Sequence, residues 1–275
     1  MDPIQDLVER LNSTKKLRVW SVIITFFGDA IVPRGGSVSA KTVQSLLSEM
    51  NIEPGAVRTA FSRLTSDGWV VREKLGRSSF FRLSATGLAP FEAATDRIYA
   101  ALPTIEAHDD GWELVFHADT YPQPTILRTG SSESSGGGGG GGYGGDADSD
   151  SFVFEGRIKQ MPDWIKAQHC QTEHKQSFEN LMDNFAPLQG INLSLRSALA
   201  ARCLLIHEWR RILFQFESVA PEFWTDDWPQ AQCHEFVSDL YRLWLQPSET
   251  WMDEEATGLA GALPAPQSDL AARFT

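Results

Sequence analysis

The stretch VRTAFSRLTSDGWVVREKLGRSSFFRLS, residues 57–84, joins a helical pattern to two β-rich runs. Its first part places four apolar residues at the i, i+3, i+4 and i+7 spacing of one buried helix face: Val57, Ala60, Phe61 and Leu64. The runs 69–74 and 79–83 lie on either side of LGRS, an arrangement typical of a β-hairpin with Gly76 near its tip. The stretch therefore predicts a helix that is followed directly by a hairpin.

Two more helices are predicted before this stretch. Residues 17–28 are apolar enough for a buried helix that ends at Gly28, and residues 39–50 show a second helical face. Pro54 suits the first position of the next helix, because its missing N–H would be unpaired there in any residue. A winged helix-turn-helix has this order of elements: helix, helix, short turn, helix and hairpin. We therefore predict a winged helix-turn-helix for residues 1–90.

Charge is distributed unevenly along the chain. The formal net charge is -12, yet residues 15–87 hold 11 basic and only five acidic residues. Double-stranded DNA requires cations for its phosphates and a narrow helix whose polar face reads base edges in the major groove. A DNA interface is therefore predicted on the exposed face of the third helix and on the hairpin: Arg58, Thr59, Ser62, Arg63, Lys74, Arg77 and Ser78. In the alternative, these are ordinary solvated side chains, or the winged helix binds a protein.

The remaining chain divides by composition. A bridging helix is expected near 88–101, short strands at 112–117 and 152–154, and helices from about 162. The low-complexity run at 131–150, with seven consecutive glycines, has too little apolar surface to fold and is expected to be a mobile loop. The predicted fold class is α+β and mostly α. Its four segments are a winged helix at 1–90, a linker helix and small α+β middle at 91–160, a C-terminal helical domain at 161–251 and a flexible tail at 252–275.

Several classes of protein are disfavoured by the sequence. The N-terminus is acidic and amphipathic, unlike a signal peptide, and no apolar run reaches the roughly 20 residues that cross a bilayer, so a cytoplasmic protein without membrane attachment is expected. Three distant cysteines, Cys170, Cys203 and Cys233, indicate no disulfide framework. His169 and His174 would diverge around a helix, so no metal site is predicted. Motifs of catalysis are not found, so neither an enzyme nor a cofactor is expected.

Five separated motifs resemble those of one known family. They are GDAIVPRGG at 28–36, VRTAFSRLTSDGWV at 57–70, LGRSSFFRLS at 75–84, LLIHEWRRI at 204–212 and DWP at 227–229. Together they resemble the PaaX-like family of phenylacetate-degradation repressors. The resemblance implies an N-terminal winged helix, a ferredoxin-like middle and a C-terminal helical domain. It also implies a homodimeric repressor that leaves its operator DNA when an aryl-CoA thioester, typically phenylacetyl-CoA, is bound.

This chain departs from that pattern in the middle. Between Gly111 and Ile158, fewer than thirty residues lie outside the low-complexity run, whereas a ferredoxin-like domain contains four strands and two helices. A reduced ferredoxin-like middle is therefore expected.

The segment HEWRR, residues 207–211, is cationic in an otherwise acidic half of the chain. An anionic effector such as a CoA thioester needs cations for its phosphates and an apolar slot for its acyl group. The candidate effector-binding residues are His207, Trp209, Arg210 and Arg211. In the alternative, this is a structural helix whose arginines pair with neighbouring acids. Two other functions are also considered: a winged-helix protein-interaction module without an acyl-CoA effector, and an enzyme that acts on an acyl-CoA.

Overall fold

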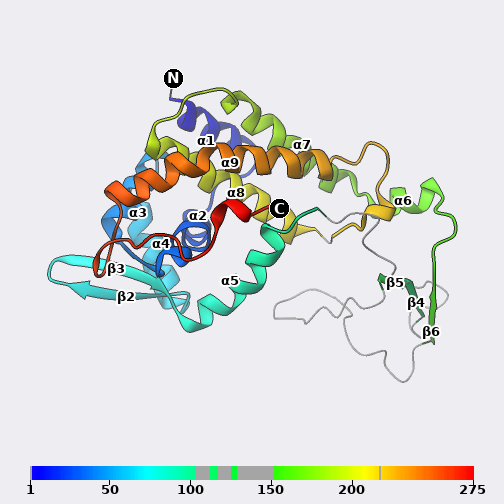
Figure 1. Ribbon diagram of the computed structural model, residues 1–275, viewed down its shortest axis with the longest axis horizontal. Helices are drawn as coiled ribbons and strands as arrows, with labels where there is room; N and C mark the ends of the chain where they lie inside the picture. Colours follow the sequence, from blue (N-terminus) through cyan, green and yellow to red (C-terminus); the bar gives the residue numbers. More distant parts are fainter. Residues whose placement is uncertain (1, 103–111, 117–124, 129–151, 217) are drawn as a thin grey trace. The chain divides into compact units, whose positions relative to one another are not determined.

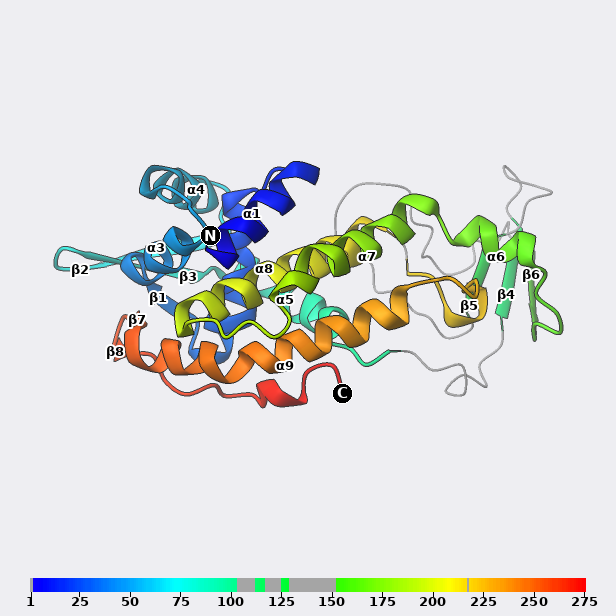
Figure 2. The same cartoon turned by 90° about the horizontal axis from the view of Figure 1, so that it is seen from above.

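A computed structural model describes residues 2–102, 112–116, 125–128, 152–216 and 218–275. The protein is mostly helical with small antiparallel sheets, which confirms the predicted α+β, mostly α class (Figures 1 and 2). The chain divides into two compact units. The first unit comprises Met1–Leu102, Thr172–Ser218 and Trp228–Thr275, and the second comprises Pro103–Gln171 and Val219–Asp227. Within the described residues, no helix is both long and apolar enough to cross a membrane.

The N-terminal part of the first unit contains five α-helices and a three-stranded sheet. Its elements are α1 (Pro3–Thr14), α2 (Val19–Phe26), η1 (Phe27–Ile31), η2 (Val32–Arg34), β1 (Ser37–Ser39), α3 (Ala40–Glu49), α4 (Pro54–Ser66), β2 (Val70–Leu75), β3 (Ser78–Leu83) and α5 (Ala85–Ile98). The Ser39 hydroxyl caps α3 by accepting from the Thr42 backbone N–H at 3.1 Å, and Pro54 begins α4. These helices and the hairpin confirm the pattern predicted from residues 39–84.

The helix predicted at 17–28 differs in both bounds. It begins at Val19 and does not stop at Gly28, because the chain continues through the wider turn η1 and the tight turn η2. The helical path ends at Gly35, whose φ of 88° lies in the left-handed region that glycine adopts without strain. The motif GDAIVPRGG therefore extends the helix by more than one turn before the chain enters β1.

The sheet of the first unit supports α4. Its strand order is β1-β3-β2, with both pairs antiparallel and with Arg82 of β3 opposite Ser37 and Val71. Phe61 of α4 stacks on Phe81 of β3, with ring centroids 3.8 Å apart and an interplanar angle of 13°. This buried aromatic pair fixes the helix against the hairpin, so the opposite face of α4 points to solvent.

The C-terminal part of the first unit is a layer of long helices. Its elements are α7 (Thr172–Phe185), η4 (Ala186–Leu188), α8 (Leu195–Gln215), α9 (Gln230–Glu255), β7 (Thr257–Gly258), β8 (Gly261–Ala262) and η6 (Leu270–Ala272). Helix α8 is buried over most of its length, because it packs against α7, α9, α2, α3 and α5. The predicted segment 1–90 therefore shares one packed unit with most of the predicted segment 161–251, whereas residues 161–171 and 219–227 belong to the second unit.

The chain end differs from the expected flexible tail. Leu263, Leu270 and Phe274 are buried, and the Phe274 backbone N–H donates to the Tyr99 carbonyl at 2.9 Å. The Gln267 N–H likewise donates to the carbonyl of Pro33 at 2.7 Å. Composition alone predicted fraying, but these apolar side chains and backbone bonds fasten the segment to the helices.

A buried ionic network crosses the first unit. Asp29 accepts hydrogen bonds from Arg202 of α8 at 2.7 Å and from Arg273 near the C-terminus at 2.8 Å. Arg202 also contacts Glu249 of α9 at 2.6 Å, and Glu249 accepts from Arg34 at 2.7 Å. Burial disfavours the charge of Asp29, but the two arginines outweigh this and hold the pKa of its carboxyl below the ordinary value. The network joins the N-terminal helices, the long C-terminal helices and the chain end.

The second unit contains a smaller antiparallel sheet. Its described elements are β4 (Trp112–Phe116), β5 (Thr125–Arg128), β6 (Phe152–Gly156), α6 (Asp163–His169) and η5 (Pro221–Phe223), and the strand order is β5-β4-β6. The edge of the Trp112 ring packs on Phe223 with centroids 5.0 Å apart. The strands β4 and β6 were predicted and β5 was not. The glycine-rich loop at 131–150 lies outside the described residues, and the ferredoxin-like middle stays a prediction.

Candidate functional site

The outer face of α4 carries the four residues predicted to read DNA: Arg58, Thr59, Ser62 and Arg63, all exposed. The Thr59 hydroxyl donates to the Gly55 carbonyl at 3.0 Å, which leaves its lone pairs and methyl group toward solvent. Nε of Arg63 donates to Asp67 at 3.4 Å, a long contact between two exposed side chains. Exposed pairs of this kind contribute little, about 0–1 kcal/mol, so Arg63 is free to exchange Asp67 for a stronger anion.

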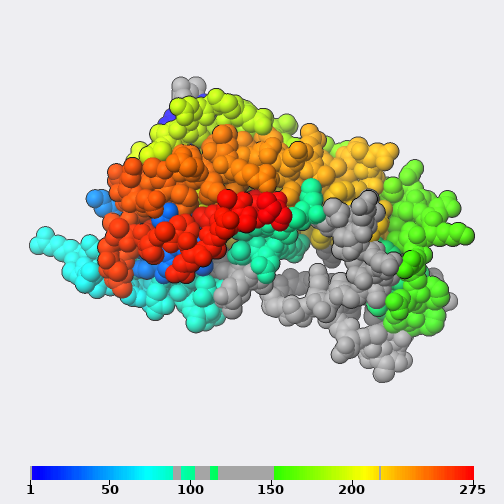
Figure 3. All heavy atoms as spheres, viewed as in Figure 1, coloured from blue at the N-terminus to red at the C-terminus, as the bar shows by residue number. Residues whose placement is uncertain are grey.

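The hairpin presents the other three predicted residues. Lys74, Arg77 and Ser78 are exposed around the turn, where Gly76 has a φ of 60°. The hairpin extends away from the helices of its unit (Figures 1 and 3). Two other hairpin cations are engaged across the strands: Arg72 donates to the Ser79 hydroxyl at 2.7 Å, and Arg82 pairs with Glu73 at 2.7 Å. The tip therefore keeps its cations available, while those in the strand interior brace the hairpin.

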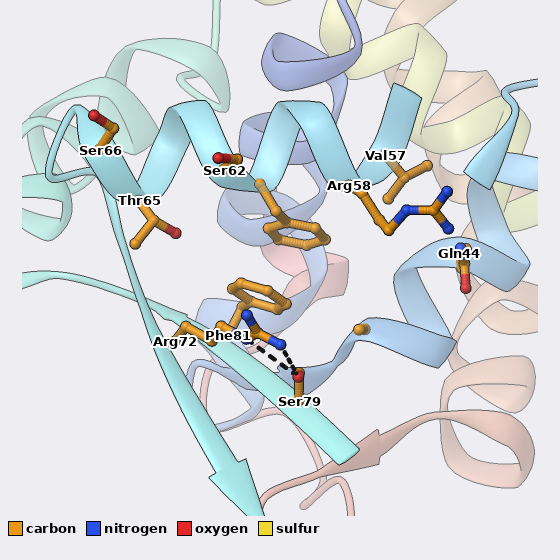
Figure 4. A pocket seen from close by; sticks show the side chains of 11 residues that line it. Gln44, Val57, Arg58, Ser62, Thr65, Ser66, Arg72, Ser79 and Phe81 are labelled. Carbon is orange, nitrogen blue, oxygen red and sulfur yellow. Dashed lines mark hydrogen bonds between the residues drawn. The ribbon is translucent and has the colours of Figure 1, made fainter. Parts of the chain in front are cut away.

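A hollow of about 650 Å³ lies between α4, the start of α3 and the hairpin (Figure 4). Arg58 of α4 and Gln44 of α3 lie at one end of it, and Thr65 and Ser66 lie at the other. The Phe61–Phe81 stack forms its apolar part. The sequence predicted Arg58 and Ser62 as part of a DNA interface but did not single out Gln44, Thr65 and Ser66. These three were missed because polar residues of this kind occur on any exposed helix surface. The side chains around the hollow can donate to phosphates and to base edges alike.

The predicted effector residues of α8 do not share one environment. His207, Arg210 and Arg211 line a second pocket of about 590 Å³. Trp209 does not: it is buried on the other side of α8, and its indole N–H donates to the Ile98 carbonyl at 2.9 Å. Trp209 therefore does not line this pocket with the other three, since neighbouring residues on a helix point about 100° apart.

Half of the second pocket comes from the segment between α1 and α2, which sequence reasoning did not connect with α8. The cations that line it are Lys15, Lys16, Arg18, Arg210 and Arg211, next to the single carboxylate Glu208. Trp20 and Phe214 supply aromatic surface. The Lys15–Lys16–Arg18 run was visible as a basic segment, but nothing in the sequence indicates that it meets residues almost 200 positions later.

Electrostatics within the second pocket differ from one α8 residue to the next. Burial, with Arg210 and Arg211 nearby, lowers the pKa of His207 to about 3, so its ring is neutral at physiological pH. Burial also lowers the pKa of the Arg210 guanidinium. Arg211 is paired with Glu208 at 2.5 Å. Arg210 is therefore the desolvated cation of the pocket, and Arg211 is the neutralised one.

Metal and thiol chemistry receive no support from the described residues. Among the described residues, no three or more histidine, cysteine, aspartate or glutamate side chains lie together in a way that could hold a metal ion. Cys170, Cys203 and Cys233 are free thiols, and burial raises the pKa of the Cys203 and Cys233 thiols. Deprotonation of these two side chains is disfavoured, which suits packing instead of reactivity.

Comparison with known proteins places this geometry in context. Residues 18–87 match the model of the PaaX-like protein family, and residues 169–260 match the model of the PaaX-like protein C-terminal domain, so the two cover more than half of the chain. The chain is 25% identical to the transcriptional repressor PaaX of Escherichia coli over 92% of its own length and 89% of the relative. It also resembles a solved structure of an uncharacterized protein from Mycobacterium tuberculosis, with 13% identity, a TM-score of 0.48, and 78% of this chain and 91% of that chain covered.

Proposed function

Because the chain belongs to the PaaX-like protein family, we propose that it is a transcriptional repressor that binds double-stranded operator DNA through α4 and the β2–β3 hairpin. The observation that supports this most is the exposure of all seven predicted polar residues on α4 and the hairpin tip, while Phe61 and Leu64 of α4 and Phe80 and Phe81 of the hairpin are buried. A single α-helix with such a face fits the major groove of B-form DNA.

Each part of this surface has its own role in the proposal. Arg58 and Arg63 lie more than one turn apart on α4, so one can bind a guanine edge while the other binds a phosphate. Thr59 and Ser62 offer hydroxyl groups that hydrogen-bond to either. Lys74 at the hairpin contacts phosphates beside the groove, together with Arg77 and Ser78.

The arrangement of α2, α3 and α4 with the sheet β1-β3-β2 supports a winged helix-turn-helix at residues 1–90. The two matched family ranges support its division from a C-terminal helical domain at 161–251, most of which packs in the same unit. A reduced ferredoxin-like middle at 91–160 completes the proposal, with three described antiparallel strands in that segment.

A homodimer is part of the same proposal. One recognition helix contacts only a few base pairs, whereas two helices about 34 Å apart read two half-sites of a palindrome on one face of the duplex. Analytical ultracentrifugation of the protein with and without operator duplex tests this directly. A complex with two chains per duplex is expected, and one chain per duplex would contradict it.

Control by an effector is the second function that we propose. The repressor regulates breakdown of an aromatic acid and leaves its operator when an aryl-CoA thioester, such as phenylacetyl-CoA, is bound. The cationic pocket beside α8 supports this, since CoA carries several phosphates and the pocket also contains aromatic surface.

The experiment for both functions begins with an operator. Selection from a random duplex library with the full-length protein should return a palindromic site, and failure to enrich any sequence would contradict operator binding. Phenylacetyl-CoA, CoA and phenylacetate are then titrated into the complex. Release by phenylacetyl-CoA with the thioester recovered intact is expected. Turnover of the thioester would favour the enzyme alternative, and operator binding without release by any of the three would exclude this effector.

A further inference from the structure

The pocket between the α1–α2 segment and α8 is lined mainly by cationic side chains. Five cationic side chains line it with only one carboxylate, Glu208, although the whole chain has a formal net charge of -12. Against this net acidity, a concave cationic site concentrates a positive field at one place. Such a site selects an anion.

Arg210 gives this pocket an uncompensated charge. Its Nη2 donates to the Ser21 hydroxyl at 2.9 Å and approaches the Ser21 carbonyl at 3.4 Å, and among the residues that the structure describes no carboxylate lies within ion-pairing distance of it. The half-buried guanidinium is therefore partly desolvated without a counterion. A desolvated charge is costly until an anion compensates it. A bound phosphate or carboxylate would supply that compensation.

The dimensions and walls of the pocket favour a small molecule over the DNA backbone. Its volume of about 590 Å³ lies within the range of roughly 300–1,000 Å³ typical of ligand sites. Trp20 and Phe214 line it, and the Phe214 ring, which is 48% exposed, has the Arg97 guanidinium carbon 5.1 Å from its centroid. Phosphates of a duplex need exposed cations alone, whereas a ligand with an apolar group also uses aromatic walls.

Trp20 links this pocket to the proposed reading face. The Trp20 ring lines the pocket, and the guanidinium carbon of Arg63 lies 5.6 Å from its centroid. Helix α2, which carries Trp20, packs directly on α4, which carries Arg63. The remaining contact of Arg63 in the described chain is the long one to Asp67. A ligand that moves the indole ring therefore removes one of the two contacts that orient Arg63.

We propose that this pocket binds a small anion that carries phosphate or carboxylate groups together with an apolar group, and that Trp20 is the positioning residue through which occupancy displaces Arg63 from its DNA-bound orientation. The proposal rests on the proposed repressor function, and it deepens it by assigning the site and the path of regulation. Lys15, Lys16 and Arg18 bind the charged end, Arg210 the most buried anionic group, and Phe214 the apolar group.

Binding to the pocket is tested by isothermal calorimetry on the full-length protein without DNA. The probes are phenylacetyl-CoA, CoA and inorganic pyrophosphate. The variant Lys15→Ala/Lys16→Ala removes two exposed cations of the pocket, and Lys159→Ala/Arg242→Ala is the matched control with the same loss of charge at exposed positions outside it. The pocket variant should bind at least about tenfold more weakly, as expected for lost charge-assisted contacts, and the control should bind as the unmodified protein does.

Three results would overturn the site. In the first, the unmodified protein binds none of the probes. In the second, the pocket variant binds the probes as tightly as the unmodified protein does. In the third, the pocket variant keeps this ligand affinity but loses operator affinity in the absence of ligand. The last result would identify Lys15 and Lys16 as phosphate contacts to DNA. Ligand binding without operator binding would instead contradict the repressor function and leave the pocket standing.

The path through Trp20 needs a separate readout. The substitution Trp20→Phe keeps an aromatic wall but shortens the ring that reaches Arg63. Coupling is measured as the ratio of operator Kd with saturating ligand to operator Kd without it, and such ratios are typically about 5–150. The ligand is held at a concentration that saturates each protein, so that the ratios are compared at full occupancy, and the coupling ratio of the variant should fall toward one. An unchanged ratio, with operator and ligand binding both intact, would refute the role of Trp20.

Discussion

Asp29 and Arg202 form an ion pair at 2.7 Å in which the side chains are 1% and 0% exposed. The two residues are 173 positions apart, in η1 and in the middle of α8. Tyr99 and Tyr241 each donate their hydroxyl to the same carboxylate, at 2.6 and 3.2 Å. The segment that precedes α3 and α4 is therefore attached to the C-terminal helices by charge as well as by packing.

Removal of the Asp29 charge should destabilise the protein strongly. Asp29→Asn leaves Arg202 and Arg273 buried without their shared carboxylate, and breaking a buried pair in this way costs about 3–5 kcal/mol. Urea denaturation followed by circular dichroism measures the free energy of unfolding. The exposed Asp96→Asn serves as control and should change stability by less than about 0.5 kcal/mol. Equal stability of the two variants would mean that the buried pair does not hold the fold together.

The chain end should contribute to stability. Phe274 is 5% exposed and packs edge-on against Tyr99 and Tyr241, with centroids 5.4 Å away in both cases. Phe274→Ala should lower the free energy of unfolding by about 3 kcal/mol or more, as for other buried phenylalanines. Leu243→Ala, at a 54% exposed position, is the matched control and should have a small effect. A tail without structural role would give the same small change in both variants.

Stability should decrease as the pH falls from about 6.5 to about 4. Burial lowers the pKa of His174 to about 4 and, with nearby arginines, that of His207 to about 3, against 6.5 in the unfolded chain. Below pH 6.5 the unfolded state binds protons that the folded state does not, so each histidine lowers stability by at most about 1.4 kcal/mol per pH unit.

Urea titrations at several pH values measure this slope. His174→Phe keeps a ring against Phe216 and removes one titration, so its stability should depend less on pH. A stability that is constant or rises over this interval would contradict the neutral, buried state of these histidines.

Salt dependence should separate the phosphate contacts from the base contacts of the proposed interface. Each phosphate contact lowers the slope of log K against log salt by about 0.9, so Lys74→Ala and Arg77→Ala should each make the slope shallower by about one. Fluorescence anisotropy with a labelled operator at several salt concentrations gives the slopes. Unchanged slopes in both variants would place the hairpin tip away from the DNA backbone.

Local sequence patterns predicted the elements that depend on near neighbours. The apolar spacing of α3 and α4, the proline at the start of α4 and the glycine at the hairpin tip act within a few residues, so they can be read without knowledge of the tertiary structure. The exposed face of α4 followed from the same spacing. The helix after Arg18 was misjudged at its end, because the wider turn through Asp29 serves a contact with α8 and not a local preference.

Long-range contacts could not be predicted in this way. Asp29 and Arg273 are separated by 244 positions, and each reads as a lone charge in the sequence. The alanine- and proline-rich chain end looked frayed because its few apolar residues find their partners only after the helices have packed. Only one side of the second pocket was predicted. The HEWRR segment indicated the side formed by α8. The other side, with Lys15 and Lys16, depends on how α1 joins α2, which the sequence does not show.

The central claim, that α4 reads operator DNA, is tested most directly by operator affinity of the Arg58→Ala/Arg63→Ala variant. Both side chains are exposed, so the variant should unfold at the same urea concentration as the unmodified protein. Lys159→Ala/Arg242→Ala, with the same loss of charge at exposed positions outside the proposed interface, is the control. The α4 variant should lose about 1–3 kcal/mol of binding energy per arginine that contacts a base, with relaxed preference at the matching operator positions. Affinity and sequence preference equal to those of the control would contradict the account.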